Sequence, residues 1–175
     1  MVNLNIDSSH SEVSFSVRHM AFAKVRGNFG KFEGTINYDA ANVANSSANI
    51  SIDASSIDTK DENRDNHLRS NDFFGAEDNP TITFVSTSVT PDDDEEFKLH
   101  GDLTMNGVTR PVTLEVEFNG SGMSPMGAEV YSFSAETKVN RKDYNMNWNA
   151  ALETGGFLVS DEVKIEIEIE ANPAQ

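Results

Sequence analysis

The 175-residue sequence contains no cysteine. This absence excludes disulfide bonds, thiolate metal sites and a cysteine nucleophile, and it leaves the redox environment open. No run approaches the roughly 18 apolar residues of a membrane-spanning helix, so we expect no stable insertion into a membrane. The first residues carry neither the basic nor the apolar segment of a secretory signal. We therefore expect a cytoplasmic protein, or a periplasmic or secreted one if a leader is removed.

Basic residues are also scarce. The chain has 13 Lys and Arg against 29 Asp and Glu, which gives a net charge of −16. Such a surface repels phosphate backbones and anionic lipid headgroups. The composition therefore argues against nucleic-acid partners and against membrane docking through a polybasic surface, with a local basic patch as the exception that composition leaves open.

What the sequence has in abundance is alternation of apolar and polar residues. Val13, Phe15 and Val17 alternate with serines near the start, and Val163 to Ile169 alternate with Lys and Glu near the end. This period of two is typical of strands with one buried face. About eight or nine such segments recur, and the chain, residues 1–175, has the length of one domain. We predict an all-β fold, either a sandwich or an antiparallel barrel of eight strands, since closure removes exposed edges.

Two turn signals indicate that strands consecutive in the sequence are also neighbours in the sheet. Asn106-Gly107 lies between two alternating runs, and this dipeptide favours the two left-handed positions of a type I′ hairpin. Pro111 cannot donate a hydrogen bond to a neighbouring strand, so it predicts an edge position or a bulge.

The interior of an eight-stranded barrel is either filled by side chains or just wide enough for one small ligand. The residues predicted to point inward are mostly Phe, Val, Ile and Leu. Any ligand should therefore be apolar. The alternation alone does not decide between a filled interior and one that holds a ligand.

Residues 60–74 break the strand pattern, because polar, charged and aromatic residues follow one another at helical spacing. Asp61 is suited to cap a short helix near residues 62–71. One interpretation makes Asp65 and His67 an acid/base pair of an enzyme. The other makes the segment a plug, with Leu68, Phe73 and Phe74 facing the barrel interior and the charged residues anchoring it. We favour the plug, because no nucleophile stands beside the pair.

Other catalytic signatures are missing. The sequence has no glycine-rich phosphate loop, HExxH helix or Gly-x-Ser-x-Gly elbow. The histidines His10, His19, His67 and His100 are not spaced as local metal ligands, so we predict no metal site.

Several short blocks run in order over nearly the whole chain. They are His10-Ser11, His19-Met20, Val25–Phe29, Phe32-Glu33-Gly34, Ser56–Thr59, Arg64-Asp65, His67-Leu68, Asp72-Phe73-Phe74, Pro80-x-Ile82-x-Phe84, Asn106–Val112 and Asn140–Tyr144. Together they resemble the YceI-like family of polyisoprenoid-binding lipid carriers. One departure is Asn145, where a glycine is usual after the last block.

The resemblance implies an extended, lipocalin-like barrel with a short helix beside it, and an apolar tunnel that holds an isoprenoid tail. The ligand would be a polyprenyl phosphate or an isoprenoid quinone, with no other cofactor. Family members are often dimeric and often exported, so a homodimer is a candidate assembly. No catalytic motif of the family can be carried over.

These observations predict non-catalytic binding, transport or storage of an isoprenoid lipid. The alternatives are an enzyme that uses Asp65 and His67, and a dimeric interaction module of a stress response. The residues predicted to line the tunnel are Phe15, Val17, Phe32, Ile36, Ile52, Phe84, Leu103, Leu114, Val116, Phe133 and Ile167. Those predicted at its mouth are Arg18, His19, Arg141 and Trp148.

Overall fold

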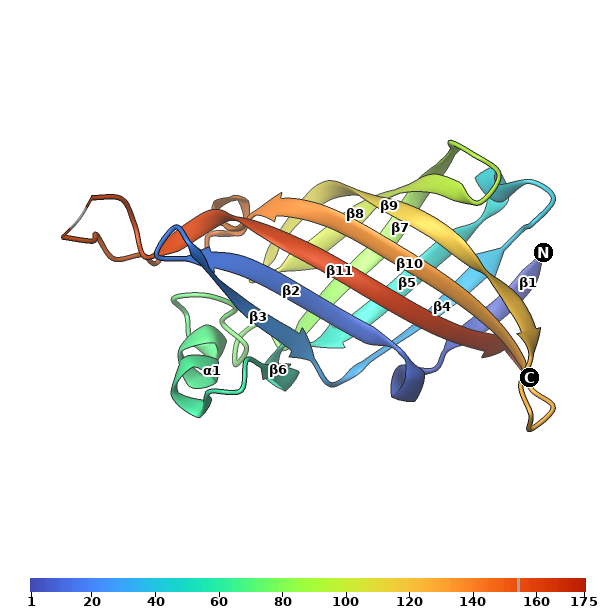
Figure 1. The fold of residues 1–175 in the computed structure, drawn as a ribbon, viewed down its shortest axis with the longest axis horizontal. Coiled ribbons are helices and arrows are strands. Elements are labelled where there is room, and N and C mark those ends of the chain that lie inside the picture. Colours follow the sequence, from blue (N-terminus) through green and yellow to red (C-terminus); the bar gives the residue numbers. More distant parts are fainter. Residues whose placement is uncertain (154) are drawn as a thin grey trace.

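The alternating segments form antiparallel strands that wind into an elongated barrel (Figure 1). The structure is a computed structural model that describes residues 1–153 and 155–175. The strands are β1 (Val2–Ile6), β2 (Glu12–His19), β3 (Ala23–Phe29), β4 (Phe32–Tyr38), β5 (Ser47–Asp53), β6 (Ile57–Asp58), β7 (Thr81–Pro91), β8 (Glu96–Met105), β9 (Val108–Met123), β10 (Glu129–Asn140) and β11 (Val159–Pro173). Short 3-10 turns η1 (Ser8–His10), η2 (Val43–Asn45), η3 (Ala54–Ser56) and η4 (Arg141–Tyr144) join some of them, and α1 (Glu62–Arg69) is the helix.

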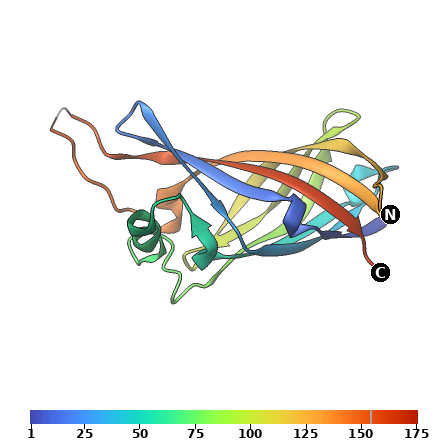
Figure 2. The same cartoon turned by 60° about the horizontal axis from the view of Figure 1, so that its bottom comes forward.

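Eight strands close the barrel. The ring runs β1-β4-β5-β7-β8-β9-β10-β11 and returns from β11 to β1, where Leu4 lies opposite Pro173. Every neighbouring pair is antiparallel. The predicted all-β, eight-stranded antiparallel barrel with one short helix is therefore confirmed. Both chain termini lie at one end of the barrel, here called the termini end (Figures 1 and 2).

At the opposite end, here called the open end, the strands diverge. There β2 replaces β1 as the neighbour of β11, and β3 pairs with β2 and β6. Pairing of β5 with β7 stops where Asp53 faces Thr81, and pairing of β9 with β10 stops where Glu115 faces Glu136. The wall thus splits between β6 and β7 and again between β9 and β10.

Helix α1 lies beside the first of these splits (Figure 2). The carboxylate of Asp61 caps it by accepting a hydrogen bond from the Arg64 backbone nitrogen at 3.0 Å. The helix ends at Arg69, because Ser70 returns to extended backbone and donates its N–H to the His67 carbonyl. The observed helix is two residues shorter at its end than the predicted range, 62–71.

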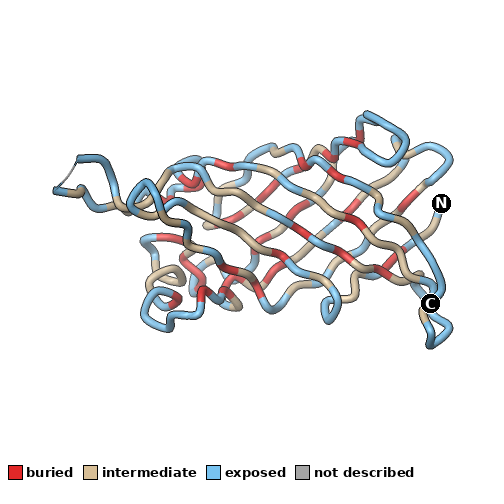
Figure 3. Tube along the Cα trace, viewed as in Figure 1, coloured by how far each residue is buried: buried red, intermediate tan, exposed pale blue. Residues whose placement is uncertain are grey.

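The termini end is filled by side chains. The rings of Tyr38, Phe118 and Phe133 lie 4.9–5.3 Å apart between centroids, and Tyr131 adds an edge contact. Leu4 and Ile169 are buried around them. Figure 3 shows that buried positions alternate with exposed ones along the strands, as a single inward face requires.

The predicted turns take the expected backbone shapes. Asn106 and Gly107 both have positive φ, 51° and 73°, in the two-residue connection of β8 to β9. Pro111 lies in the part of β9 that has no pairing with β10, which is the predicted edge position. Asn145 also has a left-handed backbone, φ 57°, directly after η4. A glycine is usual there because it adopts this conformation without a Cβ clash, and Asn tolerates it better than other residues.

We predict that Gly101→Ala destabilises the protein by about 1–3 kcal/mol. A Cβ at this position in β8 would lie 2.6 Å from the Val85 carbonyl and against the ring of Phe84. Gly122→Ala in β9 is the matched control, because nothing lies within 4 Å of its added Cβ. Urea unfolding of both variants tests this, and equal stabilities would contradict the close packing at Gly101.

Candidate functional site

A cavity of about 560 Å³ occupies the open end of the barrel. Its wall is built from inward-facing apolar side chains of the strands, and Leu68, Phe73 and Phe74 close one side. The strand residues that form most of the wall are Val13, Phe15, Val17, Val25, Phe29, Ile50, Ile52, Ile82, Phe84, Leu103, Met105, Val112, Leu114, Val139, Val163, Ile165 and Ile167. The volume lies in the usual range of about 300–1,000 Å³ for sites that take one small ligand.

The cavity exists because the two halves of the interior are filled differently. At the termini end, aromatic rings from β4, β9 and β10 meet at the barrel axis. At the open end, most inward side chains are Val, Ile or Leu, and the diverging strands hold them further apart. The aromatic cluster of Tyr38, Phe118, Tyr131 and Phe133 therefore forms a floor, and the cavity is blind rather than a tunnel through the barrel.

The charged side chains of the site gather at its mouth. Arg18 and His19 come from the end of β2, while Asp61, Arg64 and His67 come from α1 and its cap. The deeper wall is almost entirely carbon. An arrangement of this kind suits a ligand with a long apolar part and a polar group at one end.

Helix α1 covers the split between β6 and β7 with one face and is anchored by the other. Arg64, His67 and Leu68, at helical positions i, i+3 and i+4, line the cavity. On the other face Asp65 is buried and accepts hydrogen bonds from the Thr59 backbone nitrogen, at 2.8 Å, and from its hydroxyl. Arg69 donates to the carbonyls of Ser55 and Ile57.

Asp65 and His67 do not form the acid/base pair of the enzyme interpretation. The Asp65 carboxylate is held by Thr59 outside the cavity, whereas His67 faces the mouth. There the His67 Nε2 lies 2.9 Å from the Asp72 Oδ2, and the ring makes edge contacts with Phe73 and Trp148. The predicted plug places Leu68, Phe73 and Phe74 correctly, but His67 contributes to the mouth instead of anchoring the helix.

Arg141, predicted at the mouth, has a different role from a headgroup ligand. Its side chain is 3% exposed, and its guanidinium donates to four backbone carbonyls, those of Met146, Trp148, Val159 and Ser160. Burial lowers the pKa of Arg141 from its ordinary value, and the Asp161 carboxylate, 3.8 Å away, raises it again in part. Arg141 therefore ties the loop after η4 to the start of β11.

Most of the residues proposed for the site come together around this cavity. Phe15, Val17, Ile52, Phe84, Leu103, Leu114 and Ile167 lie in its wall, and Arg18, His19, Arg141 and Trp148 lie around its mouth. Four predicted residues lie outside it. Val116 and Phe133 are buried one layer below the cavity, against the aromatic floor, and Phe32 and Ile36 of β4 pack on the core without reaching the cavity. Alternation along a strand determines whether a residue faces the interior, but it does not determine how far along the barrel axis the residue lies from the mouth.

Several wall residues were not predicted. Val25, Val139, Val163 and Ile165 alternate with polar neighbours just as the predicted ones do, so the same signal could have found them. Met146 and Leu158 lie in segments without alternation, and no sequence signal marks them. Within the described residues, no cluster of three or more His, Asp or Glu is arranged to hold a metal ion. No helix in the same part of the chain is long and apolar enough to span a membrane.

We predict that Arg141→Lys lowers the free energy of unfolding by about 2–3 kcal/mol. A lysine has three donors on one nitrogen and cannot reproduce the guanidinium contacts to four carbonyls. Lys142→Gln is the control, because its half-exposed ion pair with Asp161 should contribute little. Urea unfolding and the rate of proteolysis in residues 145–158 are the measurements, and wild-type behaviour of Arg141→Lys would contradict this role.

Tyr144 gives a second prediction. It is 1% exposed, and its hydroxyl has no hydrogen-bond partner among the described residues. Tyr144→Phe should therefore leave stability unchanged or raise it by about 1 kcal/mol near pH 7, since it removes an unsatisfied buried group. Substitution by Leu, which loses the ring, should instead destabilise.

Burial raises the pKa of Tyr144 to about 12. An unfolded tyrosine ionises near pH 10, so this residue's contribution is present below about pH 10 and is lost as pH rises toward 12. Tyr144→Phe should reduce this alkaline loss without abolishing it, because burial also raises the pKa of Tyr38. Urea unfolding at neutral and alkaline pH measures the difference, and an unchanged pH dependence would contradict the assignment.

Comparison with known proteins agrees with this architecture. Residues 4–171 match the YceI-like domain. A UPF0312 protein of Staphylococcus epidermidis is 42% identical over 171 residues, which is 97% of each chain. The crystal structure of BcnA from Burkholderia cenocepacia has 27% identity and a TM-score of 0.83, covering 94% of this chain and 98% of that one.

A third structure, described as a polyisoprenoid binding domain from Saccharophagus degradans, has a TM-score of 0.70 over 99% of this chain and all of that one. At 14% identity it shows a shared fold alone. The family match covers nearly the whole described barrel, from β1 to β11, and agrees with the residue blocks identified in the sequence. The chain therefore belongs to the YceI-like domain family.

Proposed function

We propose that this protein binds one isoprenoid lipid without chemical change and carries or stores it. The apolar tail would occupy the cavity and the headgroup would lie at the mouth. The observation that carries the proposal is a blind apolar cavity of about 560 Å³ whose charged side chains are confined to its entrance. The polyisoprenoid binding described for the Saccharophagus degradans domain, which shares the fold, supports this ligand class.

Burial of the tail supplies enough free energy for tight binding. Each buried CH₂ contributes about 0.8 kcal/mol, so a few isoprene units exceed the cost of about 4–15 kcal/mol for immobilising the ligand. No polar contact deep in the cavity is needed. The aromatic floor limits depth, so we expect a tail longer than the cavity to remain partly outside and to gain no further affinity.

The choice of headgroup depends on the cations at the mouth. Arg64 already donates to the hydroxyl and the carbonyl of Thr59, and Arg141 is saturated by carbonyls. Arg18 and His19 form no ion pair within the described chain and so remain available to a phosphate. A quinone ring would instead use the aromatic side of the mouth, at Trp148 and Phe73.

The charged groups that suggested catalysis are engaged in structural contacts. Asp65 holds the turn before α1, and Arg64 and Arg69 satisfy carbonyls next to it. His67 and Asp72 make the mouth polar on one side. These contacts favour a binding role over an acid/base role for residues 60–74.

Two substitutions on the same face of β11 test the proposal. Ile165 lines the cavity, whereas Ile169 is buried beside the aromatic floor. Ile165→Trp should fill part of the empty space, keep wild-type stability and weaken lipid binding. Ile169→Trp should overpack a filled region and lower stability by about 1–3 kcal/mol, while the folded fraction still binds lipid.

The measurements are native mass spectrometry of the purified protein and titration with two probes of equal tail length, a polyprenyl phosphate and an isoprenoid quinone. Tighter binding of the phosphate, weakened by Arg18→Gln, would assign the headgroup site. If neither probe binds and organic extraction yields no apolar molecule, the proposed function is wrong.

A further inference from the structure

The hairpin that joins β2 and β3 differs in charge from the rest of the molecule. Residues 18–26 contain Arg18, Lys24 and Arg26 and no acidic residue, in a chain of net charge −16. Arg18 lies directly opposite Lys24 across the hairpin. Like charges in this arrangement repel each other, and none of the three bases forms an ion pair with any described residue. The hairpin thus presents three basic side chains that are not held in ion pairs, although Asp161 and Glu162 of the neighbouring β11 lie close to Arg18 across the pairing of the two strands.

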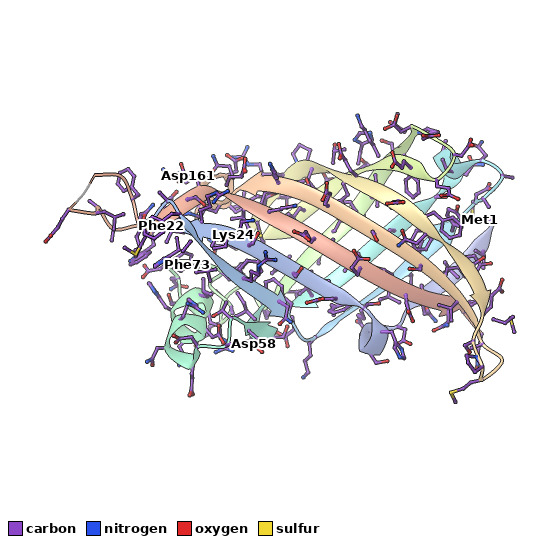
Figure 4. All side chains as sticks on the ribbon, viewed as in Figure 1. Met1, Phe22, Lys24, Asp58, Phe73 and Asp161 are labelled. Atoms are coloured by element: carbon purple, nitrogen blue, oxygen red, sulfur yellow. The ribbon has the colours of Figure 1, made fainter. Side chains whose placement is uncertain are left out.

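The tip of the same hairpin is apolar and exposed. Phe22 is 80% exposed and Met20 is 39% exposed. Figure 4 places Phe22 and Lys24 at the same end of the molecule as Phe73, with Met1 at the far end. Beside the hairpin, the loop before β11 exposes Phe157, and the Met20 N–H donates to the carbonyl of the next residue, Leu158, at 2.9 Å. Exposed apolar side chains of the hairpin tip and of the adjoining loop are therefore grouped on one side of the cavity entrance.

The basic residues, unlike the acidic ones, are unevenly distributed along the barrel. The segments that build the termini half, residues 1–12, 33–49, 86–101, 115–135 and 166–175, contain many Asp and Glu and have Lys98 as their one Lys or Arg. They include the run from Asp92 to Glu96 at the β7–β8 turn. These segments hold 15 of the 29 acidic residues, and the rest of the chain holds the other 14 together with 12 of the 13 Lys and Arg. The termini half is therefore strongly negative, whereas the charges of the open half nearly cancel.

Distance and screening decide whether this negative half prevents contact with an anionic surface. A strand of the length of β9, 16 residues, tilted as in a barrel of this kind, spans on the order of 40 Å along the axis. At physiological salt the Debye length is about 8 Å. Charges at the termini end are therefore almost fully screened from a surface that touches the open end. The local charge there is set by the three bases of the hairpin together with acidic residues of the same half, such as Asp161 and Glu162.

We propose that the β2–β3 hairpin docks the open end of the barrel on the surface of an anionic phospholipid bilayer. Phe22 and Met20 enter the boundary between headgroups and acyl chains, and Arg18, Lys24 and Arg26 contact lipid phosphates. The mouth then faces the bilayer, and a lipid tail passes between membrane and cavity without crossing water. The transfer of a lipid tail rests on the proposed function, but the docking itself needs no bound ligand.

Flotation of the full chain with vesicles tests the docking. We expect the protein to bind vesicles of phosphatidylcholine mixed with phosphatidylglycerol, to bind pure phosphatidylcholine weakly, and to dissociate as salt rises. Phe22→Ser and the double variant Arg18→Gln/Lys24→Gln should each weaken binding by roughly tenfold or more. Met126→Ser and Lys98→Gln are matched controls at the termini end, where Met126 is 95% exposed, and they should bind as wild type does.

Site-specific labelling gives an independent measurement, because the chain has no native cysteine. Ala21→Cys and Met126→Cys each accept one environment-sensitive dye. On addition of the mixed vesicles, the dye at residue 21 should report an apolar environment, and the dye at residue 126 should remain in water.

The outcomes separate this inference from the proposed function. Phe22→Ser loaded with probe from detergent should hold it as tightly as wild type, while taking it up more slowly from vesicles. If vesicles bind but no lipid enters the cavity, docking stands and the proposed function fails. Docking is overturned if wild type does not bind the mixed vesicles at low salt, if Phe22→Ser binds equally, or if sedimentation shows that Phe22 instead holds two copies of the chain together.

Discussion

The structure depends on the way β11 changes its hydrogen-bonding neighbour along its length. Near the termini β11 pairs with β1, and this contact closes the eight-stranded ring. Further along it pairs with β2, which brings β3 and β6 with it. Because β6 pairs with β3 and not with β7, the pairing that joins β5 to β7 ends at Asp53 and Thr81 and is not continued by β6. The same strand thus closes the barrel at one end and opens it at the other.

Ending a β-ladder inside a folded protein leaves carbonyls and N–H groups that need other partners. Here arginines supply many of the donors. Arg69 bonds the carbonyls of Ser55 and Ile57 beside the first split, and Arg141 bonds carbonyls around the start of β11. A planar guanidinium with five donors can serve several carbonyls at once, which a lysine cannot. The charged residues that look catalytic in the sequence largely perform this structural task.

The sequence predicted the fold well because alternation, the Asn106-Gly107 turn and the edge position of Pro111 are all local signals. It predicted the inward face of most strands for the same reason. It could not predict depth along the barrel axis, so Val116 and Phe133 were assigned to the cavity although aromatic rings fill their layer. Arg141 was misjudged because its partners are backbone carbonyls of a loop, and no sequence pattern encodes them.

A blind cavity has one consequence that a tunnel would not have. Ligand uptake and release must use the same mouth, so the surface that the mouth contacts decides which process occurs. The proposed docking would cover Phe22 and Phe157, two exposed apolar side chains at that rim, with the apolar phase of the membrane. The aromatic floor and the negative termini half leave the open end as the face at which the proposed lipid would be exchanged. Filling one half of the barrel therefore determines both where the ligand lies and from which direction it arrives.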